Sequence, residues 1–371
     1  MPTEAWLSIL QAGQIGAAAW LTVLEQCGGA EAVVAAQRRE LTRLGLSETT
    51  IDRLKSPDAD ALDRYARWLD ADEHDLLTID DARYPRLLQQ TGAAPIALWT
   101  HGARSALLTG PQIAIVGSRS ATPTGRETAQ RFAKSLSDHG LTITSGLAVG
   151  IDAAGHLGGL AGSGSTIAVL GSGLDVVYPR EHEALAAQIA SHGLIVSEYP
   201  PGTAPQRRHF PARNRIIAGM SVGTIVVEAS VRSGSLITAR LAGEYGREIF
   251  AVPGSIHNPV SRGCHRLIRQ GAKLVETAGD VLVELAPLLQ SLFQEMLDTS
   301  TPSNDDDIDR RDELSTEYQQ LLDCIGFDPT SVDEIVARST LTTAEVSSML
   351  LLLELEGQVE ALPGARYTRK A

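Results

Sequence analysis

The strongest constraint on the fold is a series of short apolar segments that alternate with helical stretches between residues 112 and 275. These segments lack polar alternation, which predicts strands that are buried on both faces. Buried strands separated by helices form a parallel sheet that helices cover on both sides. We therefore predict a doubly wound α/β domain over about residues 110–285. Its expected strands are 113–116, 141–144, 166–170, 194–196, 224–227, 248–252 and a short last strand at 273–275.

The chain ahead of this domain has a different pattern. Residues 1–70 are expected to be helical, because apolar positions recur at helical spacing and glycines interrupt them. Ser47 is placed to cap a helix that starts at Glu48, as in a small SAM or helix-hairpin-helix-like domain. Such a domain could touch nucleic acid or a partner, or it could simply cover the main domain. We favour the covering role, because many acidic residues offset the arginines, which are Arg38, Arg39 and Arg43.

Residues 71–110 carry prolines within short apolar runs, which predicts an extended lead-in that packs on the α/β domain. At the other end, residues 291–314 include a stretch rich in Pro, Ser and Asp, so we expect an acidic linker there.

Residues 315–371 predict three helices followed by a hairpin, which is the winged-helix pattern. A winged helix often reads duplex DNA through its third helix. Here that helix, capped by Thr342-Thr343, contains glutamates and no Lys or Arg, and residues 311–371 hold 11 acidic against 5 basic side chains. We therefore favour a protein-docking or dimer-accessory module over a reader of duplex DNA.

The net charge, the cysteines and the lack of long apolar runs argue against several classes of protein. A net charge of −13 argues against a protein that coats duplex DNA or an anionic membrane with its whole surface, but it leaves room for a local basic groove. Three scattered cysteines without a CxxC pair predict no metal site and fit a reducing cytoplasm. The N-terminus lacks the basic region of a signal peptide, and no apolar run reaches the roughly 20 residues of a membrane helix. We expect a cytoplasmic protein without membrane association.

Small-residue turns mark the candidate site. In doubly wound sheets, ligands bind beyond the carboxyl ends of the strands, where the strand order reverses. Glycine at such turns lets backbone N–H groups approach an anion. The turns match neither GxGxxG nor GxxxxGK[ST], so no nucleotide cofactor is expected. Each turn alone could be a tight connection, but four at one sheet edge favour anion binding. They are Gly117-Ser118-Arg119, Ser145-Gly146, Gly171-Ser172-Gly173 and Ser233-Gly234-Ser235.

A basic loop with one aromatic residue precedes the strand at 224–227. Charge along the backbone and a ring for base stacking are what single-stranded nucleic acid requires. Alternatively, the aromatic ring plugs the core and the later arginines pair with acidic neighbours. Arg119 could likewise hold a phosphate in bidentate fashion or pair with Asp152 or Glu198. The residues of the loop and the following helix are Arg207, Arg208, Phe210, Arg213, Asn214 and Arg215.

Further polar residues lie near the same edge of the predicted sheet. An enzyme could use them for acid–base chemistry, but such residues more often cap helices and orient arginines. They are Asp152, His156, Asp175, Tyr178 and Glu228.

Several ordered motifs identify a resemblance. They are GSR (117–119), SGLAVGIDAAGH (145–156), TIAVLGSGLDVVYP (166–179), SEYPPGTAPQRRHFPARNRIIAGMS (197–221), VVEASVRSGSLITARLA (226–242), IFAVPG (249–254) and SRGCHRLIRQGAKLV (261–275). Together they resemble the DNA-processing protein A family, also called DprA or Smf. The match covers the whole α/β domain, residues 80–102 fit the family's lead-in, and the terminal domains match by pattern only.

The resemblance implies an extended Rossmann-like domain over residues 111–290 that binds single-stranded DNA without cutting it. Family members protect incoming DNA in natural transformation of competent cells, help load the RecA recombinase in DNA recombination, and form homodimers through this domain. Their pocket uses the arginine of the first strand turn, here Arg119, and basic and aromatic loop residues, here Arg207 and Phe210 with Arg208 adjacent. The family's basic loop residue is usually a lysine. No catalytic residue, metal or cofactor is expected.

An alternative function is enzymatic. The α/β domain is similar to the cytokinin-activating phosphoribohydrolases, which cleave nucleoside monophosphates and carry a PGGxGTxxE turn. The corresponding stretch here, 233–239, has no acid in the first helical turn. The missing carboxylate argues against glycosidic cleavage.

Overall fold

The computed structural model describes residues 2–13, 15–299, 318, 320–325, 329–339, 341–355, 358–362 and 365–369. Most of the expected acidic linker lies outside the described residues. Its first part, residues 291–299, is helical, because helix α14 (Ala278–Thr299) continues from the α/β domain through residue 299. In the part of the chain described, no helix is long and apolar enough to span a membrane.

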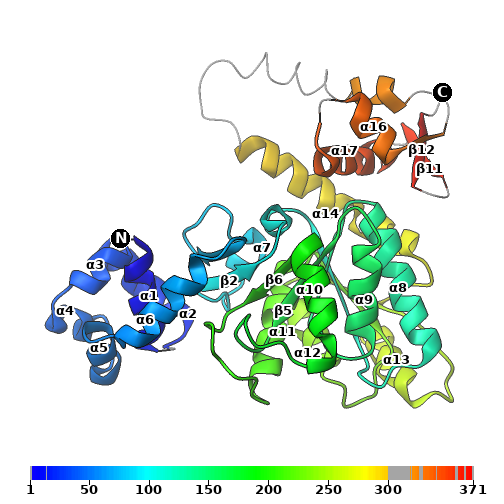
Figure 1. Ribbon diagram of the computed structural model, residues 1–371. Coiled ribbons are helices and arrows are strands. Elements are labelled where there is room, and N and C mark those ends of the chain that lie inside the picture. Colours follow the sequence, from blue (N-terminus) through cyan, green and yellow to red (C-terminus); the bar gives the residue numbers. More distant parts are fainter. Residues whose placement is uncertain are drawn as a thin grey trace.

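One nine-stranded sheet organises the molecule, in the order β1-β2-β6-β5-β4-β3-β7-β8-β9 (Figure 1). All seven predicted strands are present and run parallel to one another. Every residue of β4, β5, β6 and β7 is buried, which explains their continuous apolar sequences. The strands are β3 (Gln112–Gly117), β4 (Thr142–Ser145), β5 (Thr166–Leu170), β6 (Leu194–Ser197), β7 (Gly223–Val227), β8 (Glu248–Ala251) and β9 (Lys273–Leu274).

The lead-in adds two antiparallel strands to this sheet. Strand β1 (His74–Thr78) pairs with β2 (Ala97–His101), and β2 pairs with β6 through Trp99 and Ser197. The Tyr84 hydroxyl donates a 2.6 Å hydrogen bond to the Pro95 carbonyl and closes the connection between the two strands. The expected packing of this segment on the α/β domain is therefore made by sheet extension, so the parallel sheet predicted for the domain becomes a mixed one.

Helices cover both faces of the sheet. Along β3, Ile113 and Ile115 pack with α8 (Pro123–Asp138), α9 (Ile151–Leu160) and α14, whereas Ala114 and Val116 pack with the opposite layer. The opposite layer consists of α11 (His209–Met220), α12 (Ser235–Glu244) and α13 (Arg262–Arg269). Helix α10 (Glu183–His192) covers the β5 end of the α9 face. Short turns of helix are α7 (Arg86–Gln89), η1 (Ser105–Leu108), η2 (Arg180–His182) and η3 (Pro259–Ser261).

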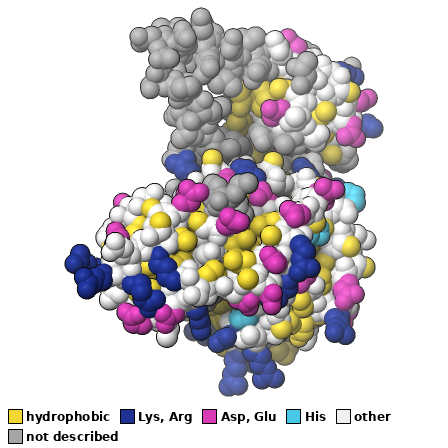
Figure 2. All heavy atoms as spheres, turned by 60° about the vertical axis from the view of Figure 1, so that its left-hand side comes forward, with side chains coloured by type: hydrophobic (Ala, Val, Ile, Leu, Met, Phe, Trp, Pro, Cys, Tyr) yellow, Lys and Arg dark blue, Asp and Glu magenta, His cyan; other side chains and the backbone are white. Residues whose placement is uncertain are grey.

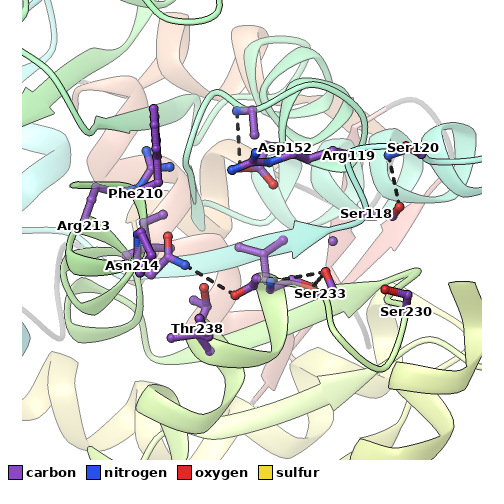
Figure 3. A pocket seen from close by; sticks show the side chains of 18 of the residues that line it. Ser118, Arg119, Ser120, Asp152, Phe210, Arg213, Asn214, Ser230, Ser233 and Thr238 are labelled. Carbon is purple, nitrogen blue, oxygen red and sulfur yellow. Dashed lines mark hydrogen bonds between the residues drawn. The ribbon is translucent and has the colours of Figure 1, made fainter. Parts of the chain in front are cut away.

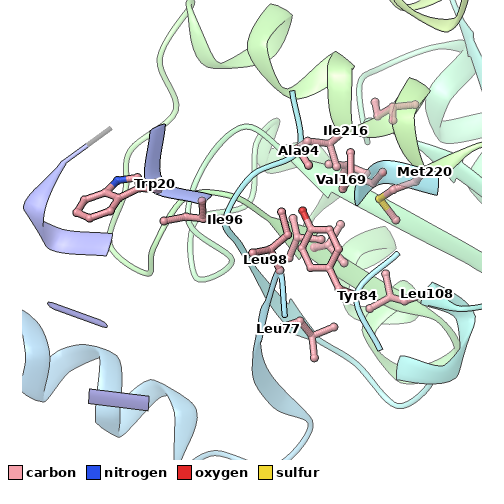
Figure 4. Packing of buried hydrophobic residues seen from close by; sticks show 14 of the residues in the cluster. Trp20, Leu77, Tyr84, Ala94, Ile96, Leu98, Leu108, Val169, Ile216 and Met220 are labelled. Atoms are coloured by element: carbon pink, nitrogen blue, oxygen red, sulfur yellow. The ribbon is translucent and has the colours of Figure 1, made fainter. Parts of the chain in front are cut away.

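The first 70 residues are helical, as predicted. Ser47 caps α5, since its Oγ accepts a 3.2 Å hydrogen bond from the Thr50 amide. Trp68 of α6 stacks on His74 of β1 at 3.9 Å between ring centroids, and buried side chains continue from Trp20 into the lead-in (Figure 4). This packing supports a covering role. The helices are α1 (Pro2–Ala12), α2 (Ala17–Cys27), α3 (Ala30–Ala35), α4 (Arg38–Arg43), α5 (Glu48–Lys55) and α6 (Ala59–Leu69).

The C-terminal residues have the predicted winged-helix elements. The third helix, α17, docks on the α/β domain: Leu351 is buried in the core formed with α8 and α14, and Glu354 lies 3.4 Å from His139 Nε2. A third contact joins Ser347 Oγ and Ser163 Oγ at 3.5 Å. The elements are a helix through 320–325, α16 (Val332–Arg338), α17 (Thr343–Leu355), and strands β10 (Thr330–Ser331), β11 (Val359–Leu362) and β12 (Arg366–Arg369).

Candidate nucleic-acid interface

A cavity of about 560 Å³ opens at the point where the strand order reverses. From β3 the chain adds β4, β5 and β6 on one side, and then returns to place β7 on the other side of β3. Residues after β3 and β7 meet there, together with the starts of α11 and α12 (Figure 3). We call this the switch-point cavity. Its position agrees with the sequence prediction and with the general rule for doubly wound sheets.

Two of the four predicted turns line this cavity. Gly117 must be glycine, because a Cβ there would collide with the Val227 carbonyl oxygen. Ser118 Oγ accepts a 3.1 Å hydrogen bond from the Ser120 amide and shapes the turn that presents Arg119. Across the cavity, Ser233, Gly234 and Ser235 form the start of α12. The hydroxyl groups of Ser233 and Ser235 lie 2.7 Å apart.

The other two turns lie behind the cavity wall and support it. The hydroxyl of Ser145 is buried and donates to the Ile115 carbonyl, and Gly146 leaves room for the Arg213 guanidinium. Gly171 sits against the Phe210 ring, where a Cβ would approach Cδ1 to 3.2 Å. Gly173 does not line the cavity, and its amide donates a 2.9 Å hydrogen bond to the Thr203 carbonyl. The expected direct contacts from these turns are therefore corrected to structural support.

Arg119 is an exposed cation at the mouth of the cavity. Among the described residues no acidic side chain lies within 4.0 Å of the Arg119 guanidinium: Glu198 pairs with Arg215 at 2.6 Å, and the negative charge of Asp152 is near Arg119 but forms no ion pair with it. The alternative of a structural ion pair is thus wrong for Arg119. Its Cζ lies 5.9 Å from the centroid of the Phe210 ring, so cation and ring face the same space.

Phe210 is half-buried, lines the cavity and does not plug the core. The Tyr178 ring lies 5.3 Å from it at an interplanar angle of 41°, and Tyr178 is 49% exposed. The sequence placed Tyr178 near the edge only as a polar residue. Its position just after the third parallel strand was the available signal for a second ring in this site.

Arg213 lines the cavity, but its guanidinium is bonded within the fold, so the structure gives it a structural role where a DNA contact was expected. It is 4% exposed, and its guanidinium donates to the carbonyls of Gly146 (2.8 Å) and Val169. Burial lowers its pKa to about 10, although the nearby Asp152 carboxylate opposes this shift. Arg213 therefore ties α11 to the ends of β4 and β5, and holds the start of α11 in place.

Asp152 is the buried counter-charge of Arg213. Its carboxylate accepts hydrogen bonds from the amides of Gly146 (3.2 Å) and Ala148 (3.4 Å). Burial raises the pKa of Asp152, and the positive charge of Arg213 opposes the rise. These two hydrogen bonds hold the carboxylate against the backbone that follows β4.

The remaining basic loop residues differ in position. Arg207 is exposed and lines the cavity, whereas Arg208 is exposed but lies outside its lining. Asn214 donates from Nδ2 to the Gly234 carbonyl at 3.5 Å, so it links α11 to the α12 turn. On the face drawn in Figure 2, Lys and Arg side chains gather at the lower edge of the molecule. Because Arg119 and Arg207 are both exposed and both line the cavity, the site carries local positive charge despite the negative net charge of the chain.

Two polar residues considered for acid–base chemistry have structural roles. His156 is fully buried, and its Nε2 accepts from the Leu147 amide while Nδ1 lies 2.7 Å from Thr166 Oγ1. Burial lowers the pKa of His156 to about 3, so the ring is neutral. The Glu228 carboxylate accepts from the amide (2.8 Å) and hydroxyl (2.5 Å) of Thr122, and so holds the residue that caps α8. Among the described residues, no group of three His, Cys, Asp or Glu side chains could hold a metal.

Comparison with known proteins identifies two matching family models. The model described as DNA recombination-mediator protein A matches residues 75–286, and the DprA winged helix domain matches residues 309–365. Protein Smf of Escherichia coli (strain K12) is 40% identical over 330 residues, which are 89% of this chain and 86% of that protein. DNA processing protein DprA of Streptococcus pneumoniae is 48% identical over 206 residues, covering 56% of this chain and 72% of that protein.

Solved structures give the same result. The X-ray structure of DNA processing protein A from Streptococcus pneumoniae aligns with a TM-score of 0.67 at 40% identity, over 75% of this chain and 95% of that chain. DNA processing protein A from Helicobacter pylori, whose structure is described in terms of its single-stranded DNA binding mode, aligns with a TM-score of 0.51 at 29% identity, over 57% and 96%. With a family model across the sheet and a relative that is similar over almost the whole chain, this chain belongs to the DNA-processing protein A (DprA/Smf) family.

Proposed function

We propose that this protein is a DNA-processing protein of natural transformation that binds single-stranded DNA in the switch-point cavity. The observation that carries the proposal is the position of an exposed cation, Arg119, beside the half-buried ring of Phe210 and the exposed ring of Tyr178, next to small-residue turns. Cations neutralise phosphates and rings stack on unpaired bases, which a duplex does not offer. The single-stranded DNA binding mode described for the Helicobacter pylori relative supports this assignment.

In the cytoplasm, the bound strand would be protected and passed to the RecA recombinase. The family description as a recombination mediator supports this role. A homodimer through the α/β domain would extend the binding surface. Strand β9 is suited to such a contact, because it pairs only with β8 among the described strands and leaves Leu274 51% exposed.

We propose no catalytic activity for the protein. The first turn of α12 carries no acidic residue, and the carboxylate of Asp152 is bonded within the cavity wall. Incubation with nucleoside monophosphates tests the alternative of a phosphoribohydrolase-like enzyme. We expect no release of free base; release above the uncatalysed background would contradict this part of the proposal.

Binding is tested by fluorescence anisotropy of the full-length protein with single-stranded and duplex oligonucleotides at several salt concentrations. We expect single strands to bind more tightly than duplex. Arg119→Ala and Arg207→Ala should each weaken single-strand binding about 10-fold or more, since a charge-assisted hydrogen bond contributes about 1.5–3 kcal/mol. Arg64→Ala removes another exposed arginine, which lies on the N-terminal helices, and serves as the control. Equal affinities for all three variants and the wild type would refute the site.

A further inference from the structure

A second cavity of about 350 Å³ lies beside the switch-point cavity at the same edge of the sheet. It is bounded by the start of α8, the end of β7 and the loop that follows β8. Two short turns separate the cavities. Ser120 lines the first and Thr122 the second on one turn, while Ser230 lines the first and Glu228 the second on the other. The two cavities therefore lie on either side of the same pair of turns.

Apart from Glu228, the adjacent cavity is lined by neutral residues, and these include several hydrogen-bonding side chains beside the apolar Val227, Val252 and Pro253. Within the described part of the structure, the hydroxyls of Thr124, Thr128 and Ser261 have no hydrogen-bond partner. Asn258 uses its Oδ1 to accept from the Val260 amide at 3.1 Å, which leaves its amide N–H groups available. Several donors therefore converge on a space that the protein itself does not fill.

Glu228 supplies the acceptor in this cavity. It holds a left-handed backbone conformation (φ 53°), which is rare for a residue with a side chain and marks an over-determined position. Each carboxylate oxygen accepts one hydrogen bond from Thr122, and an ionised carboxylate has about four acceptor positions. Acceptor capacity therefore remains for a ligand.

The chemistry of this lining selects the ligand class. No Lys, Arg or His lines the cavity, and the Glu228 charge disfavours a phosphate. The free hydroxyls disfavour an apolar group, because burial would leave them unsatisfied. A neutral planar ring with donors and acceptors at its edge meets both conditions, and a carboxylate accepts well from an exocyclic amino group such as cytosine N4.

We propose that the adjacent cavity is a base subsite: it receives a nucleobase of the strand whose phosphates lie at Arg119 in the switch-point cavity. The inference rests on the proposed single-strand binding function. It adds to that function a position at which the strand is held by its base edge and not by its phosphate.

The test compares oligodeoxycytidylate of six nucleotides with the dinucleotide, using anisotropy on the full-length protein. Thr128→Val removes a donor without changing size, and Thr124→Trp fills the cavity from an exposed position. Both variants should bind the hexanucleotide about 5- to 10-fold more weakly, as expected for one lost base contact. Both should keep the wild-type salt dependence and the wild-type affinity for the dinucleotide. Thr22→Val and Thr22→Trp, on the exposed face of α2, are the matched controls.

The salt dependence of binding distinguishes a failure of the base subsite from a failure of the proposed single-strand binding at Arg119. Arg119→Ala should reduce the slope of log K against log [salt] by about 0.7, because one phosphate contact is lost. Wild-type affinity in both threonine variants, with a clear loss in Arg119→Ala, would overturn the base subsite and leave the proposed function intact. A reduced slope in Thr124→Trp would also overturn it, since the cavity would then hold a phosphate. An unchanged slope in Arg119→Ala would refute the switch-point site, and with it the subsite.

Discussion

Arg213→Met should be among the most destabilising single substitutions in the α/β domain. The guanidinium is buried, donates to the carbonyls of Gly146 and Val169, and lies beside the buried Asp152 carboxylate. Methionine fills a similar volume but leaves the carbonyls without their donor and the carboxylate without its cation. Each buried carbonyl that loses its donor costs about 1–3 kcal/mol, and the nearby carboxylate loses a favourable positive charge, so we expect a loss of about 3 kcal/mol or more in the free energy of unfolding.

The loss should depend on pH in a defined direction. Burial raises the pKa of Asp152, and Arg213 normally opposes this rise. Without Arg213 the folded-state pKa rises further above the unfolded value, so the folded variant binds the proton more tightly. A group with a raised pKa stabilises the fold at low pH, and this contribution is lost as the pH rises through the folded-state pKa. The deficit of Arg213→Met relative to the wild type should therefore be smaller at pH 5 than at pH 8.

Urea denaturation followed by circular dichroism measures these differences. Asp152→Asn combined with Arg213→Met should recover part of the stability lost at pH 8 and remove most of the difference between the two pH values. Arg240→Met, which breaks an exposed helical ion pair with Glu244, is the control and should cost about 0.5 kcal/mol or less. A cost below about 1 kcal/mol for Arg213→Met at pH 8 would refute the structural role of this arginine, since it would fall short of the loss expected for two buried carbonyls without a donor.

Three further predictions follow from single contacts. Phe210→Ala should weaken single-strand binding by about 1–3 kcal/mol while Phe210→Trp retains it, because stacking on a base depends on the ring; equal binding in anisotropy would contradict stacking. Burial alone would lower the pKa of His139, but its contact with Glu354 raises the pKa above the ordinary value. The protonated ring therefore stabilises the docked winged helix at low pH, and this stabilisation is lost as the pH rises through the folded-state pKa. Glu354→Gln should therefore lower Tm more at pH 6 than at pH 8, and an equal shift would contradict the contact. Gly125→Ala should destabilise by about 1 kcal/mol in urea, since its Cβ would displace the Glu228 carboxylate from the α8 cap; a gain in stability would show that the cap tolerates the change.

The sheet could be predicted from sequence because its parallel strands are buried on both faces. Segments such as Thr166–Leu170 read as uninterrupted apolar runs for that reason. The antiparallel strand Ala97–His101 was expected only as an extended segment. It lies between prolines and loops, and its pairing with β6 depends on contacts nearly 100 residues away in the chain. Pairing between strands so far apart in the chain produces no recognisable pattern in the local sequence.

The position of the site followed from the turns at the strand ends, but the role of each residue did not. Arg119 and Arg213 look alike in sequence, yet one is exposed and the other is enclosed by Gly146, Val169 and Asp152. This difference arises from the packing of α11 against β4 and β5, which residue spacing does not encode. Tyr178 was missed as a ring for the same reason: its contact with Phe210 joins two separate crossovers of the sheet.

The most direct test of the account is photo-cross-linking of a single strand that carries 4-thiothymidine, with the attached peptides identified by mass spectrometry. If the strand stacks in the switch-point cavity, cross-links should map to peptides that contain Tyr178 or Phe210, and Arg119→Ala should reduce their yield. Cross-links confined to α1–α6 or to the winged helix would contradict the central claim.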